Sequence, residues 1–332
     1  MASSSRSAPF TQRTALVAGL AALAALSAAP GARAAWPERT ITLIACFPAG
    51  GGTDIAARLI APPLGEALGT PVVVENRGGA GGSIGTAVAA RAAPDGYTFL
   101  VCSSAFVVNP SLYAKTAYDP FKDFSPVMVL GASPNVLTVP AQSDIKTMAE
   151  LIARAKADPG KLNWSSPGAG TTPYLAGEVL QLRTGTKMVH IPFTGAGPAL
   201  TAVLGGQVDM YTANLGSLQP QIQGGKVRAL AVTAAKRWPD LPDVPTLDEV
   251  GVHEAISDTF QGLFAPARTP QPVIDRMVKE VQAILARPDI QERYAKSGLP
   301  VVAEPPAVFR ARIAREVPMY KEIIDKAGLK IQ

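Results

Sequence analysis

Histidine, aromatic residues and charge are all scarce in this sequence. Its 332 residues include two histidines, 6% Phe, Trp and Tyr, and 17% charged residues, and no basic tract occurs. The formal net charge is +5. The first 34 residues contain three arginines and no acidic residue, so the rest of the chain has 28 cations and 26 acids, a net charge of +2. Nucleic-acid-binding domains carry a clustered basic surface, often with aromatic residues. We therefore exclude nucleic acid as a partner.

Side chains for catalysis or metal binding are equally sparse. Only His190 and His253 could serve a Ser-His-Asp triad, and no group of His, Cys, Asp and Glu has the spacing of metal ligands. Ser83 lies in a Gly-x-Ser-x-Gly stretch, but six residues separate it from the preceding expected strand, whereas a nucleophile elbow begins directly at the strand end. We interpret Ser83 as a helix N-cap and expect no catalytic residue, metal or cofactor.

Beyond residue 34, no segment is long and apolar enough to cross a membrane. Arg6 and Arg13 precede an alanine- and leucine-rich segment over residues 14–29, and residues 32–34, Ala-Arg-Ala, have the small-x-small pattern of a cleavage site. The apolar segment is short for a span of about 20 residues, and no cysteine stands at the cleavage site to carry a lipid. We expect residues 1–34 to be a cleaved secretory signal peptide rather than a membrane anchor.

A glycine-rich loop stands out among the features that are present. The segment Phe47–Asp54, FPAGGGTD, follows an apolar, β-branched segment, Ile41–Cys46, and precedes apolar residues at helical spacing. Glycines let a ligand approach the backbone, and the start of a helix offers free N–H groups and a positive dipole end. The loop lacks the lysine of a phosphate-binding P-loop and the Gly-x-Gly-x-x-Gly of a dinucleotide site. This pattern predicts a site for a small carboxylate, and a tight turn without a ligand is the alternative.

Strands and helices alternate along the rest of the chain. Strands are expected over residues 72–76 and 97–102, and a second series begins near Val136. In that series a strand over residues 162–165 runs into a loop of small residues, Ser166–Tyr174, and then a helix. Such alternation is typical of mostly parallel α/β sheets with ligands at the carboxyl ends of the strands. We therefore predict an α/β protein in which two similar loops, one in each half, hold a ligand between two lobes.

Further candidate contacts lie where other strands end and helices begin. Asn214 is one of them, and a role as a turn cap is an equal alternative for it. The complete set of predicted ligand-binding residues is Phe47, Ala49, Gly50, Gly51, Thr53, Asp54, Ser103, Ser104, Gly168, Gly170, Thr171, Thr172, Phe193, Thr194, Gly195, Tyr211 and Asn214.

Ten short motifs occur in a characteristic order along the chain. They are WP at residues 36–37, FPAGG at 47–51, VVENR at 73–77, GAGG at 79–82, PDGYT at 94–98, NPSLY at 109–113, GGQVD at 205–209, LAVT at 230–233, LPDVPT at 241–246 and AG at 327–328. With this set the sequence resembles, over residues 36–330, the Bug family, the periplasmic solute-binding proteins of tripartite tricarboxylate transporter systems.

That resemblance implies a type II periplasmic-binding-protein-like fold, with two α/β lobes around a ligand cleft. Lobe I would comprise residues 36–135 with 256–332, and lobe II residues 136–255. Family loops that match Phe47–Asp54 and Gly168–Thr172 hold the ligand carboxylate. The resemblance also implies a periplasmic, non-enzymatic monomer that delivers a small carboxylate to the membrane components of a tripartite transporter.

One departure from the family pattern bears on the charge of the ligand, and one alternative function remains open. Thr194 stands where the family often has lysine, which argues against a highly charged ligand. An exported hydrolase or isomerase acting on a small carboxylate is the alternative function, and Asp54 or His190 would be its base.

The two cysteines end the first and third expected strands, which are neighbours in a doubly wound sheet. An exported protein can keep a disulfide between Cys46 and Cys102. Neighbouring strands lie about 4.8 Å apart, however, and a disulfide prefers Cα atoms about 5.5–6 Å apart with converging Cβ atoms. We leave both states open and favour two small buried thiols.

Overall fold

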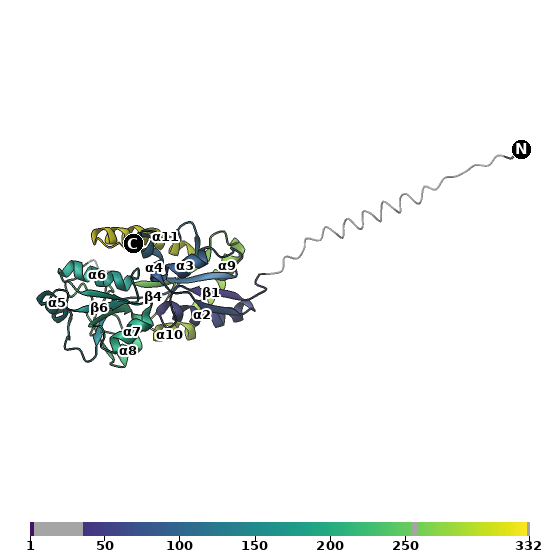
Figure 1. Ribbon diagram of the computed structural model, residues 1–332. Helices are drawn as coiled ribbons and strands as arrows, with labels where there is room; N and C mark the ends of the chain where they lie inside the picture. The colour runs from purple at the N-terminus through teal and green to yellow at the C-terminus, as the bar shows by residue number, and fades with distance from the viewer. Residues whose placement is uncertain (3–35, 254–257, 331–332) are drawn as a thin grey trace. The chain divides into compact units, whose positions relative to one another are not determined.

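The computed structural model describes residues 1–2, 36–253 and 258–330, and it divides the chain into two units, residues 1–38 and 39–332. The predicted signal peptide falls almost entirely on residues 3–35, which lie outside the described part. The second unit contains two sheets with helices packed against them (Figure 1). Throughout residues 36–253 and 258–330, every helix falls short of the length and apolarity that a bilayer span requires.

The first sheet has the strand order β11-β4-β10-β3-β1-β2. Its strands are β1 (Ile41–Ala45), β2 (Val72–Asn76), β3 (Thr98–Ser103), β4 (Phe124–Ser133), β10 (Thr259–Pro266) and β11 (Val301–Glu304). The helices that accompany it are α2 (Gly52–Leu68), α3 (Ser83–Ala90), α4 (Ala105–Leu112), α9 (Gln271–Leu285), α10 (Pro288–Lys296) and α11 (Pro306–Lys326), with a short 3₁₀ turn η1 (Ala80–Gly82) before α3.

The second sheet has the strand order β7-β6-β8-β5-β9. Its strands are β5 (Asn135–Pro140), β6 (Asn163–Ser166), β7 (Val189–Pro192), β8 (Met210–Asn214) and β9 (Val227–Val232). Its helices are α5 (Met148–Ala157), α6 (Thr172–Thr184), α7 (Ala196–Leu204) and α8 (Leu215–Gln223). The chain leaves the first sheet where β4 ends, enters the second at β5, and returns to the first at β10. The α/β class with two lobes is confirmed.

Most strands of each sheet run in the same direction, as predicted, but three are reversed, namely β10 and β11 in the first sheet and β5 in the second. Strand β1 is parallel to β2 and β3, and β6 is parallel to β7 and β8. Strands β10 and β5, in contrast, run antiparallel to both of their neighbours. Strand β5 follows β4 directly, without a helix between them, and β10 begins after the chain crosses back from the second sheet. The local alternation of strand and helix carries no information on such long-range pairings.

Helix α2 carries the glycine loop at its start. Ala56, Ile60 and Leu64 are fully buried and recur every four residues, so this stripe packs the helix against the protein. Prolines 62 and 63 lie inside the helix, which continues through them to Leu68. Burial of a large apolar side chain stabilises by about 1.5–3 kcal/mol, which offsets the lost N–H groups of the prolines.

Cys46 and Cys102 form a disulfide, so the favoured expectation of two buried thiols is wrong. Ala45 pairs with Val101 in the parallel ladder between β1 and β3. The next residue on each strand is a cysteine, so this register places Cys46 beside Cys102. Their Cα atoms lie 5.3 Å apart. Equal register puts both side chains on the same face of the sheet, and the sequence alone could not establish that register.

A buried arginine fixes the start of β10. Arg312 of α11 donates to Asp258 at 2.6 Å, to Glu316 at 2.7 Å and to Glu304 at 3.2 Å. Its guanidinium also lies over the ring of Phe260, 4.9 Å from the centroid. Burial raises the pKa of Glu316, although Arg312 opposes this shift. The cluster therefore ties α11 to the strand whose first residues reach the candidate site described below.

A second buried cluster supports the loop after β6. The His190 ring lies 4.3 Å from the Trp164 centroid and 4.9 Å from that of Tyr174, and its Nε2 is 2.9 Å from Ser166 Oγ. Ser166 Oγ in turn accepts a hydrogen bond from Gly168 N at 3.3 Å. Burial lowers the pKa of His190 from 6.5 to about 4, so the imidazole is neutral when the protein is folded at pH 7.

We predict that His190 makes folding sensitive to acid. The unfolded chain binds a proton at His190 between pH 6.5 and about 4, and the folded protein does not. Stability is therefore present above pH 6.5 and is lost as the pH falls toward 4. In urea unfolding at a series of pH values, H190Q should lose less stability over this window than the wild type. L182Q, at an exposed position of α6 without a titratable group, should keep the wild-type profile. Parallel profiles for wild type and H190Q would contradict this role of His190.

Candidate functional site

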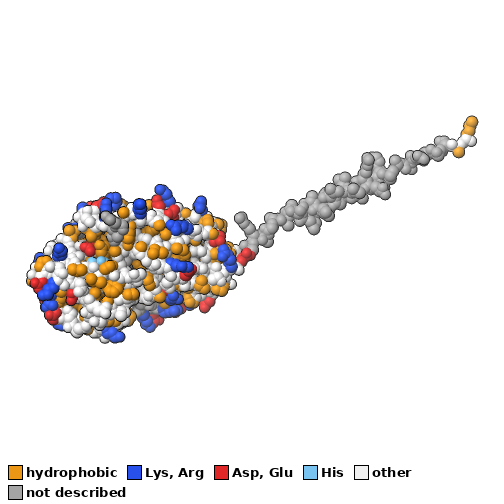
Figure 2. Space-filling view, viewed as in Figure 1, with side chains coloured by type: hydrophobic (Ala, Val, Ile, Leu, Met, Phe, Trp, Pro, Cys, Tyr) orange, Lys and Arg blue, Asp and Glu red, His pale blue; other side chains and the backbone are white. Residues whose placement is uncertain are grey.

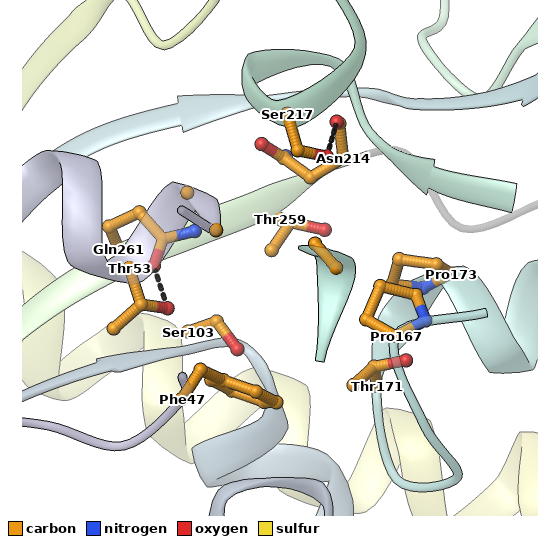
Figure 3. A pocket seen from close by; sticks show the side chains of 13 residues that line it. Phe47, Thr53, Ser103, Pro167, Thr171, Pro173, Asn214, Ser217, Thr259 and Gln261 are labelled. Atoms are coloured by element: carbon orange, nitrogen blue, oxygen red, sulfur yellow. Dashed lines mark hydrogen bonds between the residues drawn. The ribbon is translucent and has the colours of Figure 1, made fainter. Parts of the chain in front are cut away.

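A cavity lies where elements of the two sheets meet (Figure 3). It contains about 410 Å³ that no atom fills, part of it open to solvent. Its wall consists of Phe47, Gly51, Gly52, Thr53, Ser103, Pro167, Thr171, Pro173, Ala196, Asn214, Ser217, Thr259 and Gln261. We call it the first cavity. None of these residues carries a charge, yet many are polar.

Four helices begin at this wall, namely α2, α6, α7 and α8. Thr171 caps α6 by accepting from Tyr174 N at 3.3 Å, and Asn214 caps α8 by accepting from Gly216 N at 3.1 Å. Helices α2 and α7 have glycine at the cap, Gly51 and Gly195, and no side chain accepts from their first N–H groups. The alternative role of Asn214 as a cap is thus confirmed.

The two glycine-capped helix starts lie close together. A Cβ built on Gly51 would be 3.7 Å from Ala196 Cβ. The first N–H groups of a helix lack partners within the helix, and the dipole makes that end positive. Two such ends beside one cavity favour an anion there without help from lysine or arginine.

The glycine loop is held by Asp54. Its carboxylate accepts from Gly50 N at 3.0 Å, from Arg58 Nε at 2.8 Å and from Asn76 Nδ2 at 2.9 Å. Asn76 Nδ2 also lies 3.0 Å from the carbonyl oxygen of Phe47, to which it can donate. Asp54 is only 4% exposed, and both it and the Gly50 N–H are committed to the loop. The geometry therefore makes Asp54 a brace for the loop, and it also removes Asp54 as a candidate base.

Strand β10 supplies wall residues that the sequence analysis missed. Thr53 Oγ1 donates to Gln261 Oε1 at 2.7 Å, and this bond turns Gln261 Nε2 toward the cavity (Figure 3). Thr259 Oγ1 donates to Asn135 Oδ1 at 2.8 Å and also contacts the hydroxyl of Thr172. One signal could have revealed Gln261, since it is a lone amide in the otherwise apolar run Phe260–Pro266, and all eight residues of β10 are buried.

The remaining missed residues are small, cyclic or hydroxylated and have no distinctive sequence signal. They are Gly52, Pro167, Pro173, Ala196 and Ser217. Ser217 Oγ donates to the Asn214 carbonyl at 2.8 Å (Figure 3), and this bond fixes the first turn of α8.

A second cavity shares Phe47 and Pro167 with the first. Four predicted residues line it, namely Gly168, Phe193, Thr194 and Gly195, and they do not line the first cavity. Here the two halves touch, because Tyr113 Oη donates to the Ala169 carbonyl at 3.1 Å.

The structure thus brings six of the predicted residues to the first cavity, namely Phe47, Gly51, Thr53, Ser103, Thr171 and Asn214. Seven others line neither cavity, namely Ala49, Gly50, Asp54, Ser104, Gly170, Thr172 and Tyr211. Several of these support the wall from behind. Ser104 Oγ accepts from Phe260 N at 2.9 Å, and Tyr211 Oη donates to the Ala196 carbonyl at 3.3 Å.

The surface around these elements carries both signs of charge. On the face shown in Figure 2, Lys and Arg side chains are interspersed with Asp and Glu. Among the described residues, no group of three or more His, Cys, Asp and Glu side chains is placed to hold a metal ion.

Comparison with known proteins places this fold and site in a family. The profile described as tripartite tricarboxylate transporter family receptor matches residues 56–329. The structure of periplasmic binding protein BugD is 38% identical, with a TM-score of 0.86 over 90% of this chain and 100% of its own. Rpa4515 of R. palustris, solved with adipate, is 32% identical, with a TM-score of 0.85 over 89% of this chain and 99% of its own.

MatC (Rpa3494) from Rhodopseudomonas palustris, solved with bound malate, is 33% identical, with a TM-score of 0.81 over 87% of this chain and 100% of its own. These proteins are solute-binding proteins and not enzymes. The chain therefore belongs to the tripartite tricarboxylate transporter family of receptors, which includes the periplasmic solute-binding proteins of the Bug group.

Proposed function

We propose that this protein is exported after cleavage of residues 1–34, binds a small carboxylate in the periplasm as a monomer, and delivers it to the membrane components of a tripartite transporter. The lobes that close on the ligand would be residues 36–135 with 256–332 and residues 136–255. Membership of β1–β4, β10 and β11 in one sheet, and of β5–β9 in the other, supports this division.

One observation carries the proposal, namely the two glycine-capped helix starts beside a cavity without charged side chains. We infer that one carboxylate of the ligand lies between the starts of α2 and α7. Gln261 Nε2 and the Ser103 hydroxyl are the neighbouring side-chain donors. Phe47, Pro167 and Pro173 then face the carbon chain of the ligand.

The energies are sufficient for useful affinity. A dissociation constant near 1 μM requires about 8 kcal/mol. Each hydrogen bond to a charged group contributes about 1.5–3 kcal/mol, and a helix dipole adds about 0.3–2 kcal/mol. Three or four such bonds with two helix ends contribute about 5–16 kcal/mol. This range spans the requirement, and its upper part also offsets the cost of association. One carboxylate is stabilised in this way, whereas a tricarboxylate would leave further charges without a cation.

Calorimetry with acids of graded charge tests this proposal. The mature chain is titrated with hexanoate, adipate, malate and citrate, and with hexanamide as the uncharged control. We expect binding of mono- or dicarboxylates, much weaker binding of citrate, and none of hexanamide. Adipate and malate are included because related structures contain them. Equal binding of hexanamide, or binding of citrate alone, would contradict a single-carboxylate anchor, and failure of every acid would contradict the proposed function.

We predict that Gln261 is a determinant of affinity. Q261E keeps the shape of the side chain but sets a negative charge beside the ligand carboxylate, so affinity for the best acid of that series should fall about 100-fold at pH 8. Q261M removes the donor without adding charge and should cost about tenfold. As the pH is lowered to 5.5, Q261E should recover part of its affinity and Q261M should not. Equal losses in both variants at both pH values would show that charge at this position is irrelevant.

A further inference from the structure

The disulfide lies directly behind two residues of the first cavity. Cys46 precedes Phe47, and Cys102 precedes Ser103, and both of these neighbours line the cavity. The parallel ladder between β1 and β3 ends at the pair Ala45–Val101. One main-chain bond extends it, from Cys46 N to the Val101 carbonyl at 3.0 Å. Beyond that bond the disulfide is the link that joins the two strand ends.

The surroundings of the bridge are tightly packed. Both sulfur-bearing residues are fully buried. A Cβ built on Gly82 would lie 3.2 Å from Cys46 Sγ and 3.1 Å from Phe47 Cε2, and one built on Gly85 would lie 2.9 Å from Cys46 Cα. The start of α3 therefore covers the bridge and the Phe47 ring together, and only glycine allows so close an approach. The bridge is therefore shielded from solvent and forms part of the packed interior.

The segment that the bridge encloses contains the anion-binding loop. The two cysteines are 56 residues apart, and the glycine loop, α2, β2, α3 and most of β3 lie between them. Phe47 is fixed on both sides, by the bridge before it and by Asn76 at its own carbonyl. Ser103 is fixed by the bridge before it and by the contact of its Oγ with Ala105 N at 3.3 Å.

We propose that Cys46 and Cys102 are positioning residues of the ligand site, whose bridge holds Phe47 and Ser103 at the spacing that binding requires. This proposal rests on the proposed function, because it assigns the bridge an effect on ligand affinity as well as on stability. Strand β3 stays paired with β10 as far as Ser103. Without the bridge, the end of β1 and Phe47 therefore move relative to β3, and the wall loses its fixed shape. The glycine loop that follows Phe47 then samples positions in which its N–H groups no longer converge.

The test compares the wild type with the double variant Cys46→Ala, Cys102→Ala. Peptide mapping without reductant first establishes the bridge in the exported wild-type protein, and two free thiols there would overturn the proposal. Hydrogen exchange of the ligand-free proteins is then measured by mass spectrometry, and adipate affinity by calorimetry. We expect exchange at residues 46–54 to rise at least tenfold, with no change at residues 135–140 and 210–214 of the second sheet. Adipate affinity should fall about tenfold.

A matched control separates positioning from general stability. Ile41 is fully buried at the opposite end of β1. The control is Ile41→Ala or Ile41→Val, whichever lowers Tm by the same amount as the double cysteine variant. This control should leave exchange at residues 46–54 and adipate affinity unchanged. If the double variant does not fold, Cys46→Val with Cys102→Ala refills the volume of the sulfur atoms and takes its place. A bridgeless variant that loses Tm but keeps wild-type exchange and affinity would overturn the proposal. If the wild type does not bind adipate, the best acid of the calorimetric series replaces it. If no acid binds, the proposed function fails, and the exchange measurement still decides the role of the bridge.

Discussion

Main-chain N–H groups left open at two helix starts determine the character of this site. Every helix begins with N–H groups that have no partner inside the helix, and a capping side chain usually satisfies one of them. Thr171 and Asn214 do so for α6 and α8. At α2 and α7 the cap is glycine, which has no side chain to offer. Positive potential is thereby concentrated at one end of the cavity, and no lysine or arginine occupies the space that the ligand needs.

The other interactions around the site serve to hold these donors in place. Asp54 uses its carboxylate on the loop itself, so the loop cannot relax away from the start of α2. Gln261 is oriented by Thr53, which belongs to that same helix start. The strand that carries Gln261 is anchored in turn by Arg312, through Asp258. A site built on main-chain groups requires such bracing, because peptide groups move only when the whole segment moves.

The sequence predicted the loops well and the side-chain directions within them poorly. Segment Phe47–Asp54 could be identified because strand, glycines and helix follow one another locally. That local pattern could not show that Asp54 points back into the loop, since this depends on Arg58 and on Asn76 of the next strand. The reversed strands and the paired cysteines were missed for the same reason, because each depends on register between distant segments. Gln261 was overlooked because its place beside the start of α2 depends on a contact with Thr53, far away in the sequence.

A carboxylate anchor made of peptide groups is encoded by where glycine stands and where a helix begins, and not by any reactive side chain. Substitutions at Pro167, Pro173 or Ser217 of the wall would alter its shape and polarity while every main-chain donor stayed in place. Such a receptor can change the carbon skeleton that it accepts through single mutations and still recognise the acid group. Its evolution toward new nutrients then needs no intermediate that has lost the ability to bind.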